Sequence, residues 1–158
     1  MLILPYGITG GYYYKGQEPD RPSVDKDQFV KRCQQVAAKH GMRTEVYEHV
    51  WGNFYAIMFD GGDKPFFAVL NKFHPYMAFA DYDLFGQFGS GFPLHYIDFP
   101  EIARDFAGEY RVLTTEELAK EFHLVDQPEL RFMQSIREQV DYYKPTTFGD
   151  VIFNCWDA

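Results

Sequence analysis

Histidine is the residue type in this chain best suited to acid–base or metal chemistry. Two imidazoles reach one metal ion when they are spaced His-x-x-x-His on a helix or His-x-His on a strand. No two of the histidines have either spacing, so we expect no metal site built on them. The five are His40, His49, His74, His95 and His123.

Asp81 and Asp83 form a second possible centre, because alternate residues of a strand point to one face. Two such carboxylates could hold a divalent cation. With His74 or His95 they could also supply the acid and base of a small hydrolase or transferase. No third cation ligand can be placed beside them, so we expect neither a metal nor a cofactor. A carboxylate–histidine enzyme stays open as an alternative, since carboxylate pairs leave no motif.

Other catalytic motifs are not found in the sequence. No serine stands in a Gly-x-Ser-x-Gly elbow, and the glycine-rich segment 7–11 lacks the Lys-Ser/Thr of a P-loop. Cys33 falls on the apolar side of an expected helix and Cys155 in an apolar run, so both are expected to be buried. These observations predict a binding protein and not an enzyme.

Acidic residues are concentrated in the second half of the chain. The net charge is −8; residues 1–80 carry 9 Lys/Arg and 8 Asp/Glu, whereas residues 81–158 carry 6 and 15. An acidic surface repels nucleic acid and speeds encounter with a basic protein. We therefore expect a basic protein partner and no nucleic acid. The carboxylates expected to contribute are Asp98, Glu101, Asp105, Glu109, Glu116 and Glu117.

Aromatic residues make up 19% of the chain, and some of them fall in glycine-rich loops. Tyr12 and Tyr13 lie in the loop 7–20, and Phe85 and Phe88 lie in the loop 83–93. Aromatic side chains commonly anchor protein interfaces, so we expect these four to contact the partner. The alternative is a ligand-binding or structural module in which they form stacking platforms for carbohydrate.

An N-terminal helix and a run of strands are predicted next to each other. Apolar residues recur at helical spacing over 26–40, and Gly41 can end the helix. Strands separated by turn residues then predict an antiparallel meander of about four to six members, with a tight hairpin at 60–63. The strands are expected at 1–4, 43–50, 53–59, 64–70, 76–81 and 94–98.

Helices are predicted for the rest of the chain. One covers 100–106, another runs from a capping box at Thr114 to about Phe122, and a third runs from about 126 to Tyr143. Thr147 can cap a last helix, although 151–156 could also be a buried strand. The expected core residues of this last segment are Phe148, Val151, Ile152 and Trp156.

This order of elements defines an α+β fold: an N-terminal helix, an antiparallel meander and a C-terminal group of helices. We expect one domain over residues 1–158. No window approaches the roughly 20 apolar residues of a membrane span, and the first residues do not form a signal peptide. The expected location is therefore the cytoplasm, away from membranes.

The segment 142–157 reads YYKPTTFGDVIFNCWD. It resembles the ending of small bacterial immunity proteins, which neutralise the toxins of contact-dependent and other polymorphic toxin systems. The acidic, aromatic-rich α+β chain without catalytic motifs is similar too. The resemblance implies a cognate protein toxin as partner and neutralisation by direct binding. It assigns no binding residue.

The sequence predicts that zinc and calcium do not stabilise the protein. Binding to the folded state alone would raise the melting temperature in a saturable way. Thermal unfolding measured with either metal should therefore match unfolding in the presence of a chelator. A saturating rise in melting temperature would instead point to Asp81 and Asp83.

Overall fold

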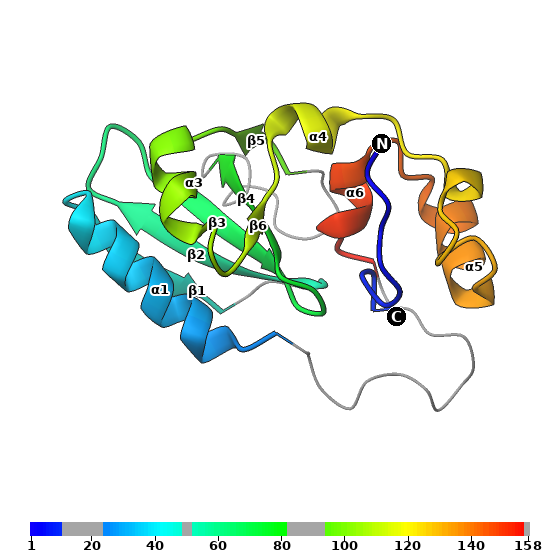
Figure 1. Ribbon diagram of the computed structural model, residues 1–158, viewed down its shortest axis with the longest axis horizontal. Helices are drawn as coiled ribbons and strands as arrows, with labels where there is room; N and C mark the ends of the chain where they lie inside the picture. Colours follow the sequence, from blue (N-terminus) through cyan, green and yellow to red (C-terminus); the bar gives the residue numbers. More distant parts are fainter. Residues whose placement is uncertain (11–23, 49–51, 82–93, 157–158) are drawn as a thin grey trace.

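The computed structural model describes residues 1–10, 24–48, 52–81 and 94–156. Figure 1 shows a central sheet with α1 alongside β1 and β2, and with α5 at the opposite end of the molecule. The elements are α1 (Lys26–Lys39), β1 (Arg43–Tyr47), β2 (Phe54–Asp60), β3 (Phe66–Asn71), β4 (Tyr76–Asp81), β5 (Tyr96–Ile97), α3 (Pro100–Phe106), β6 (Arg111–Val112), α4 (Thr115–Ala119), a 3₁₀ turn (Leu124–Asp126), α5 (Gln134–Tyr143) and α6 (Phe148–Ile152).

The sheet confirms the predicted meander. Its order is β1-β2-β3-β4-β5, and each neighbouring pair is antiparallel. The predicted hairpin joins β2 to β3, and Gly61 adopts a φ of +118° there, a conformation that favours glycine. The short strand β6 was not predicted: it pairs in parallel with β4. Two residues are too few to show strand periodicity in a sequence.

Both faces of the sheet are covered, and successive residues of β3 show how. Phe67 and Val69 pack into one apolar cluster together with α6 and residues from α4 and α5. Ala68 and Leu70 pack into the other, together with α1 and α3. All six residues of β3 are buried as a result. The continuous apolar sequence of this strand follows from its burial on two sides.

The predicted helix at 26–40 is confirmed as α1, and its ends have clear causes. The Asp25 side chain accepts a hydrogen bond from the backbone N–H of Gln28, as an N-cap does. Gly41 follows the helix with a φ of +72°. The apolar stripe that packs on the sheet consists of Phe29, Cys33, Val36 and Ala37.

The strand predicted at 1–4 is wrong. Leu4 is buried, but its backbone N–H donates to Oε1 of Gln127 at 2.7 Å, and the carbonyl of Leu2 accepts from Nε2 of the same side chain at 3.0 Å. A buried glutamine thus bonds to the peptide groups that a neighbouring strand would otherwise pair. The N-terminal segment is fixed by a residue more than 120 positions away.

The C-terminal helices are shorter than predicted. α4 ends at Ala119, and α5 begins at Gln134. The helix expected from about 126 is interrupted because the backbone at Gln127 is extended, which directs its side chain to the N-terminal segment. The predicted cap at Thr147 is confirmed, with Asp150 completing a capping box, and α6 ends at Ile152.

Two residues beyond α6 differ from their predicted burial. Phe148, Val151 and Ile152 are core residues as expected. Trp156 is only partly buried and stacks on Tyr143 with ring centroids 5.3 Å apart. Cys155 is also only partly buried. Because the helix stops at Ile152, its periodicity no longer turns these two side chains toward the core.

Two buried asparagines join the sheet to segments from both ends of the chain. Asn53 precedes β2, and Asn71 ends β3. Each donates through Nδ2 to the carbonyls of Ile8 and Ile152, at 2.8–3.0 Å. Each carbonyl oxygen therefore accepts two hydrogen bonds, which uses both of its lone pairs. These two carbonyls do not take part in the hydrogen bonding between strands of the sheet. The two asparagines therefore bond to polar groups that would be costly to bury without a partner.

Replacing Asn71 should destabilise the protein markedly. Its Oδ1 also accepts from the backbone N–H groups of Phe73 and His74. Asn71→Leu keeps the size of the side chain and leaves those donors without an acceptor, so we expect a loss of about 2–3 kcal/mol in the free energy of unfolding. Urea denaturation measures the loss.

The matched control for this substitution is Gln34→Leu, because Gln34 is exposed on α1. It should change the free energy of unfolding by less than about 0.5 kcal/mol. Equal stability of Asn71→Leu and the wild type would show that the asparagine network does not hold the fold together.

Candidate functional site

Four of the six predicted carboxylates lie just before α3 or in the first turns of α3 and α4. Asp98 lies two residues before α3 and accepts hydrogen bonds from the backbone N–H and the hydroxyl of Thr115, at 3.0 and 2.7 Å. Because Thr115 is the first residue of α4, these bonds bring the start of one helix to the start of the other. We call this group the acidic junction: it consists of Asp98, Glu101, Glu116 and Glu117.

Glu117 has a structural role within the acidic junction. It forms the capping box of α4 with Thr114 and lies 3.2 Å from a guanidinium nitrogen of Arg111. Burial raises the pKa of its carboxyl, but the hydrogen bonds from Thr114 and Arg111 outweigh this and leave the pKa below its usual value. Glu117 therefore stays ionised, and the positive charge of Arg111 compensates part of its negative charge.

Glu101 and Glu116 differ from Glu117. Both are exposed and lie in the first turns of α3 and α4, where a negative charge interacts favourably with the helix dipole. Within the described part of the chain, neither forms a side-chain hydrogen bond or an ion pair. In the acidic junction, Glu101 and Glu116 are thus exposed to solvent, while Asp98 and Glu117 form hydrogen bonds within the protein.

The other two predicted carboxylates, Asp105 and Glu109, face α1 instead. Asp105 lies 2.7 Å from Nζ of Lys39 and 2.8 Å from Nε2 of His40. Hydrogen bonds from Lys39 and then His40 hold the pKa of Asp105 below its usual value. Glu109 lies 3.5 Å from Nε of Arg32. These two carboxylates join α1 to the segment around α3.

The predicted aromatic contacts Tyr12, Tyr13, Phe85 and Phe88 lie outside the described residues. They remain a prediction. The structure identifies exposed apolar side chains that the sequence analysis did not select: Val125, Phe132 and Tyr142 are 70%, 67% and 79% exposed. Arg131 lies over the ring of Phe132 at 4.6 Å.

A sequence signal for Phe132 did exist. This residue falls outside the buried stripe of Leu130, Met133 and Ile136, so its apolar side chain has no place in the core. Val125 and Phe132 line an open hollow of about 480 Å³ together with Leu124, Arg131 and Arg137.

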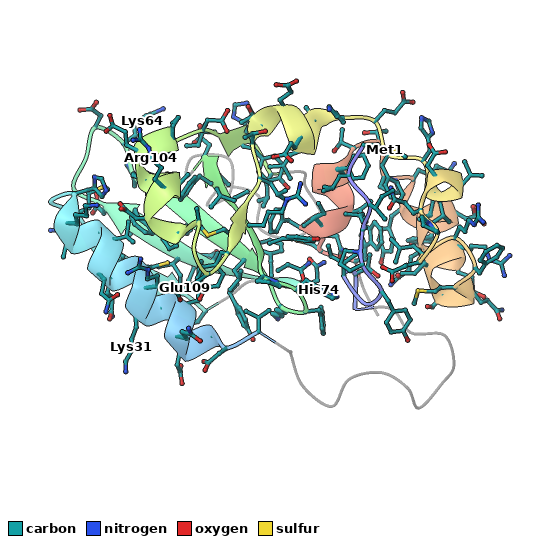
Figure 2. The ribbon with its side chains drawn as sticks, viewed as in Figure 1. Met1, Lys31, Lys64, His74, Arg104 and Glu109 are labelled. Atoms are coloured by element: carbon teal, nitrogen blue, oxygen red, sulfur yellow. The ribbon has the colours of Figure 1, made fainter. Side chains whose placement is uncertain are left out.

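The histidine–carboxylate pairs are only partly brought together. His95 Nδ1 lies 3.8 Å from Oδ2 of Asp81, on a largely exposed side chain. His74 Nε2 instead lies 2.6 Å from the carbonyl oxygen of Tyr6 (Figure 2), so it fixes the N-terminal loop. Asp83 lies outside the described residues. Among the residues that the structure places, no three His, Cys, Asp or Glu side chains form a group that could hold a metal ion.

Comparison of the chain with models of known families, with curated proteins and with solved structures gives no significant match in any of the three. Among the helices of the described residues, none has the length and apolar composition needed to cross a membrane.

Asp105→Asn should lower stability at pH 7 and have less effect in acid. A depressed pKa in the folded state means that the charged carboxylate stabilises the fold above the pKa of the unfolded chain, about 3.9. The contribution is lost as the pH falls from that value through the lower, folded pKa. The difference in unfolding free energy between wild type and variant should therefore shrink below about pH 4.

Urea denaturation from pH 3 to 7 tests this dependence. Asp63→Asn is the control, since Asp63 is exposed in the hairpin turn and should show a small difference at every pH. A constant difference for Asp105→Asn across the range would mean that the ion pairs with Lys39 and His40 do not stabilise the fold.

Proposed function

We propose that this protein is a non-enzymatic binding protein, and specifically a bacterial immunity protein that neutralises a cognate toxin by direct contact. The acidic junction carries the proposal. It presents Glu101 and Glu116 to solvent from two helix starts that Asp98 joins by hydrogen bonds of 2.7 and 3.0 Å. A fixed acidic surface is suited to a basic protein, because complementary charge steers association and selects the partner.

The charge distribution supports the same partner class. The acidic excess of residues 81–158 disfavours nucleic acid as a ligand. Asp105 and Glu109 lie against cations of α1, so they contribute less to an external field than Glu101 and Glu116. In this proposal the predicted aromatics Tyr12, Tyr13, Phe85 and Phe88 supply the buried contacts, while the carboxylates set the rate of encounter. The proposed place of action is the cytoplasm.

One observation favours a second candidate function. Tyr143 and Trp156 stack in parallel with ring centroids 5.3 Å apart, and the largely exposed Tyr142 meets Tyr143 edge-on. A group of aromatic rings near the surface can stack on the apolar faces of sugars. A carbohydrate-binding module is therefore the alternative. Binding of free oligosaccharides that Tyr142→Ala abolishes would favour it.

Capture of the toxin tests the proposed function directly. The tagged protein is used to isolate partners from its source organism, and each captured protein is expressed alone and together with this chain. The proposal expects a basic protein that arrests growth alone and is harmless in co-expression. Captured proteins that are not toxic, or toxicity that co-expression does not relieve, would contradict it.

Charge reversal at the acidic junction should slow binding to that partner. Glu101→Lys with Glu116→Lys removes the exposed carboxylates and leaves the hydrogen bonds of Asp98 and Glu117 in place. We expect several-fold slower association at low salt, nearly unchanged dissociation, and a smaller effect at high salt. Stopped-flow or surface plasmon resonance measures both rates.

The control pair Glu45→Lys with Asp63→Lys makes the same change in net charge elsewhere on the surface. It should slow association less than the junction pair. Equal slowing by both pairs would attribute steering to net charge alone and remove the acidic junction from the proposal.

A further inference from the structure

Two lysines lie over the ring of one tyrosine at the end of the sheet where α1 begins, and both line the same cavity. Lys26 is the first residue of α1, Lys72 follows β3, and Tyr55 belongs to β2. Their Nζ atoms lie 5.6 and 5.3 Å from the centroid of the Tyr55 ring. The backbone of Lys72 is fixed on both sides: its N–H donates to Asn53, and its carbonyl accepts from Val24. These bonds fix the backbone from which the Lys72 side chain extends over Tyr55.

The charged form of the Lys72 side chain is destabilised by its surroundings. Burial lowers its pKa, and the positive charge of Lys26 lowers it further. Within the residues that the structure describes, no carboxylate lies within ion-pair distance of Lys72. The fold thus holds a partly buried cation beside a second cation, an arrangement that a bound anion would relieve.

A cavity of about 100 Å³ lies beside these side chains. This volume corresponds to about three water molecules at their liquid density, and is enough for one tetrahedral oxyanion. Its lining consists of Lys26, Val46, Tyr47, Glu48, Phe54, Tyr55, Ala56 and Lys72.

In the described part of the chain, three carboxylates lie near this cavity: Asp25, Asp27 and Glu48. Asp25 and Asp27 both raise the pKa of Tyr55, but the Oδ1 of Asp25 accepts from the backbone of Gln28 as the N-cap of α1. Asp27 is exposed to solvent, which weakens its field. Glu48 is the direct competitor, because it lines the cavity and pairs with Lys26 at 3.2 Å. Its side chain is 63% exposed, so an anion can displace it into water.

We propose that this cavity binds a phosphate group, as inorganic phosphate or as a phosphomonoester, between the ammonium groups of Lys72 and Lys26. Lysine binds phosphate as a compact point charge, and Lys72 has no carboxylate within ion-pair distance among the residues that the structure describes. The site uses none of the acidic junction, so it extends the proposed function without depending on it.

Titration with inorganic phosphate tests the site. Binding is followed by thermal shift and by amide NMR shifts at constant ionic strength, with chloride as the balancing anion. The wild type should saturate, and Lys72→Met should bind about tenfold more weakly, the loss expected for one charge-assisted contact. The control is Lys31→Met: Figure 2 shows Lys31 pointing away from the protein on α1, and this variant should bind like the wild type.

Glu48→Gln should strengthen phosphate binding, whereas Lys72→Met should weaken it. A gain in affinity cannot be explained by unfolding of the variant. Removal of the competing carboxylate frees Lys26, so phosphate should bind more tightly than to the wild type.

Glycerol 3-phosphate, titrated in parallel, distinguishes the two sources: a site for phosphomonoesters binds both compounds, and a site closed to esters binds inorganic phosphate alone.

The proposal is overturned if phosphate causes no saturable change in the wild type, if Lys72→Met and Lys31→Met bind equally, or if Glu48→Gln binds more weakly. Each of these results would show that the two lysines do not form a phosphate site, whatever partner the acidic junction binds.

Discussion

The fold depends on two backbone carbonyls that lie outside any regular ladder. Ile8 and Ile152 stand near opposite ends of the chain, and their carbonyl oxygens accept hydrogen bonds from the same two asparagine side chains, Asn53 just before β2 and Asn71 at the end of β3. Gly52, next to this point, has no room for a side chain: an added Cβ would collide with the carbonyl oxygen of Asn154. The C-terminal segment can therefore lie directly on the sheet, and α6 can cover one of its faces.

In the part of the chain that the structure describes, some acidic side chains bond within the protein and others are exposed without such partners, a difference that the count of acidic residues does not show. Of six neighbouring carboxylates, four bond to the protein itself: Asp98 and Glu117 at α4, Asp105 and Glu109 at α1. Only the remaining two are held at the surface without such partners among the described residues. Of these six carboxylates, only Glu101 and Glu116 therefore offer a negative charge that the described residues do not already pair.

Local signals in the sequence predicted the elements that depend on neighbouring residues. Thr114 and Thr147 cap helices where their spacing indicated, and the glycine turn at 60–63 joins two strands. The N-terminal segment was mispredicted because Gln127 supplies its hydrogen bonds from more than 120 residues away. The acidic junction could be predicted residue by residue but not as a group, since it depends on the contact between Asp98 and Thr115. The lysine pair over Tyr55 has no sequence motif at all.

The strand β4 has two partners along one edge. β5 pairs with its residues 79 and 80, and β6 pairs with residues 76 and 77. These residues of β4 are consequently paired within the chain itself. At the opposite end of the sheet, β1 pairs with β2 alone in the described part of the chain, and it exposes the charged side chains of Arg43 and Glu45. Charged residues on an edge strand discourage edge-to-edge pairing, so Arg43 and Glu45 disfavour aggregation through β1 in a chain with 19% aromatic residues.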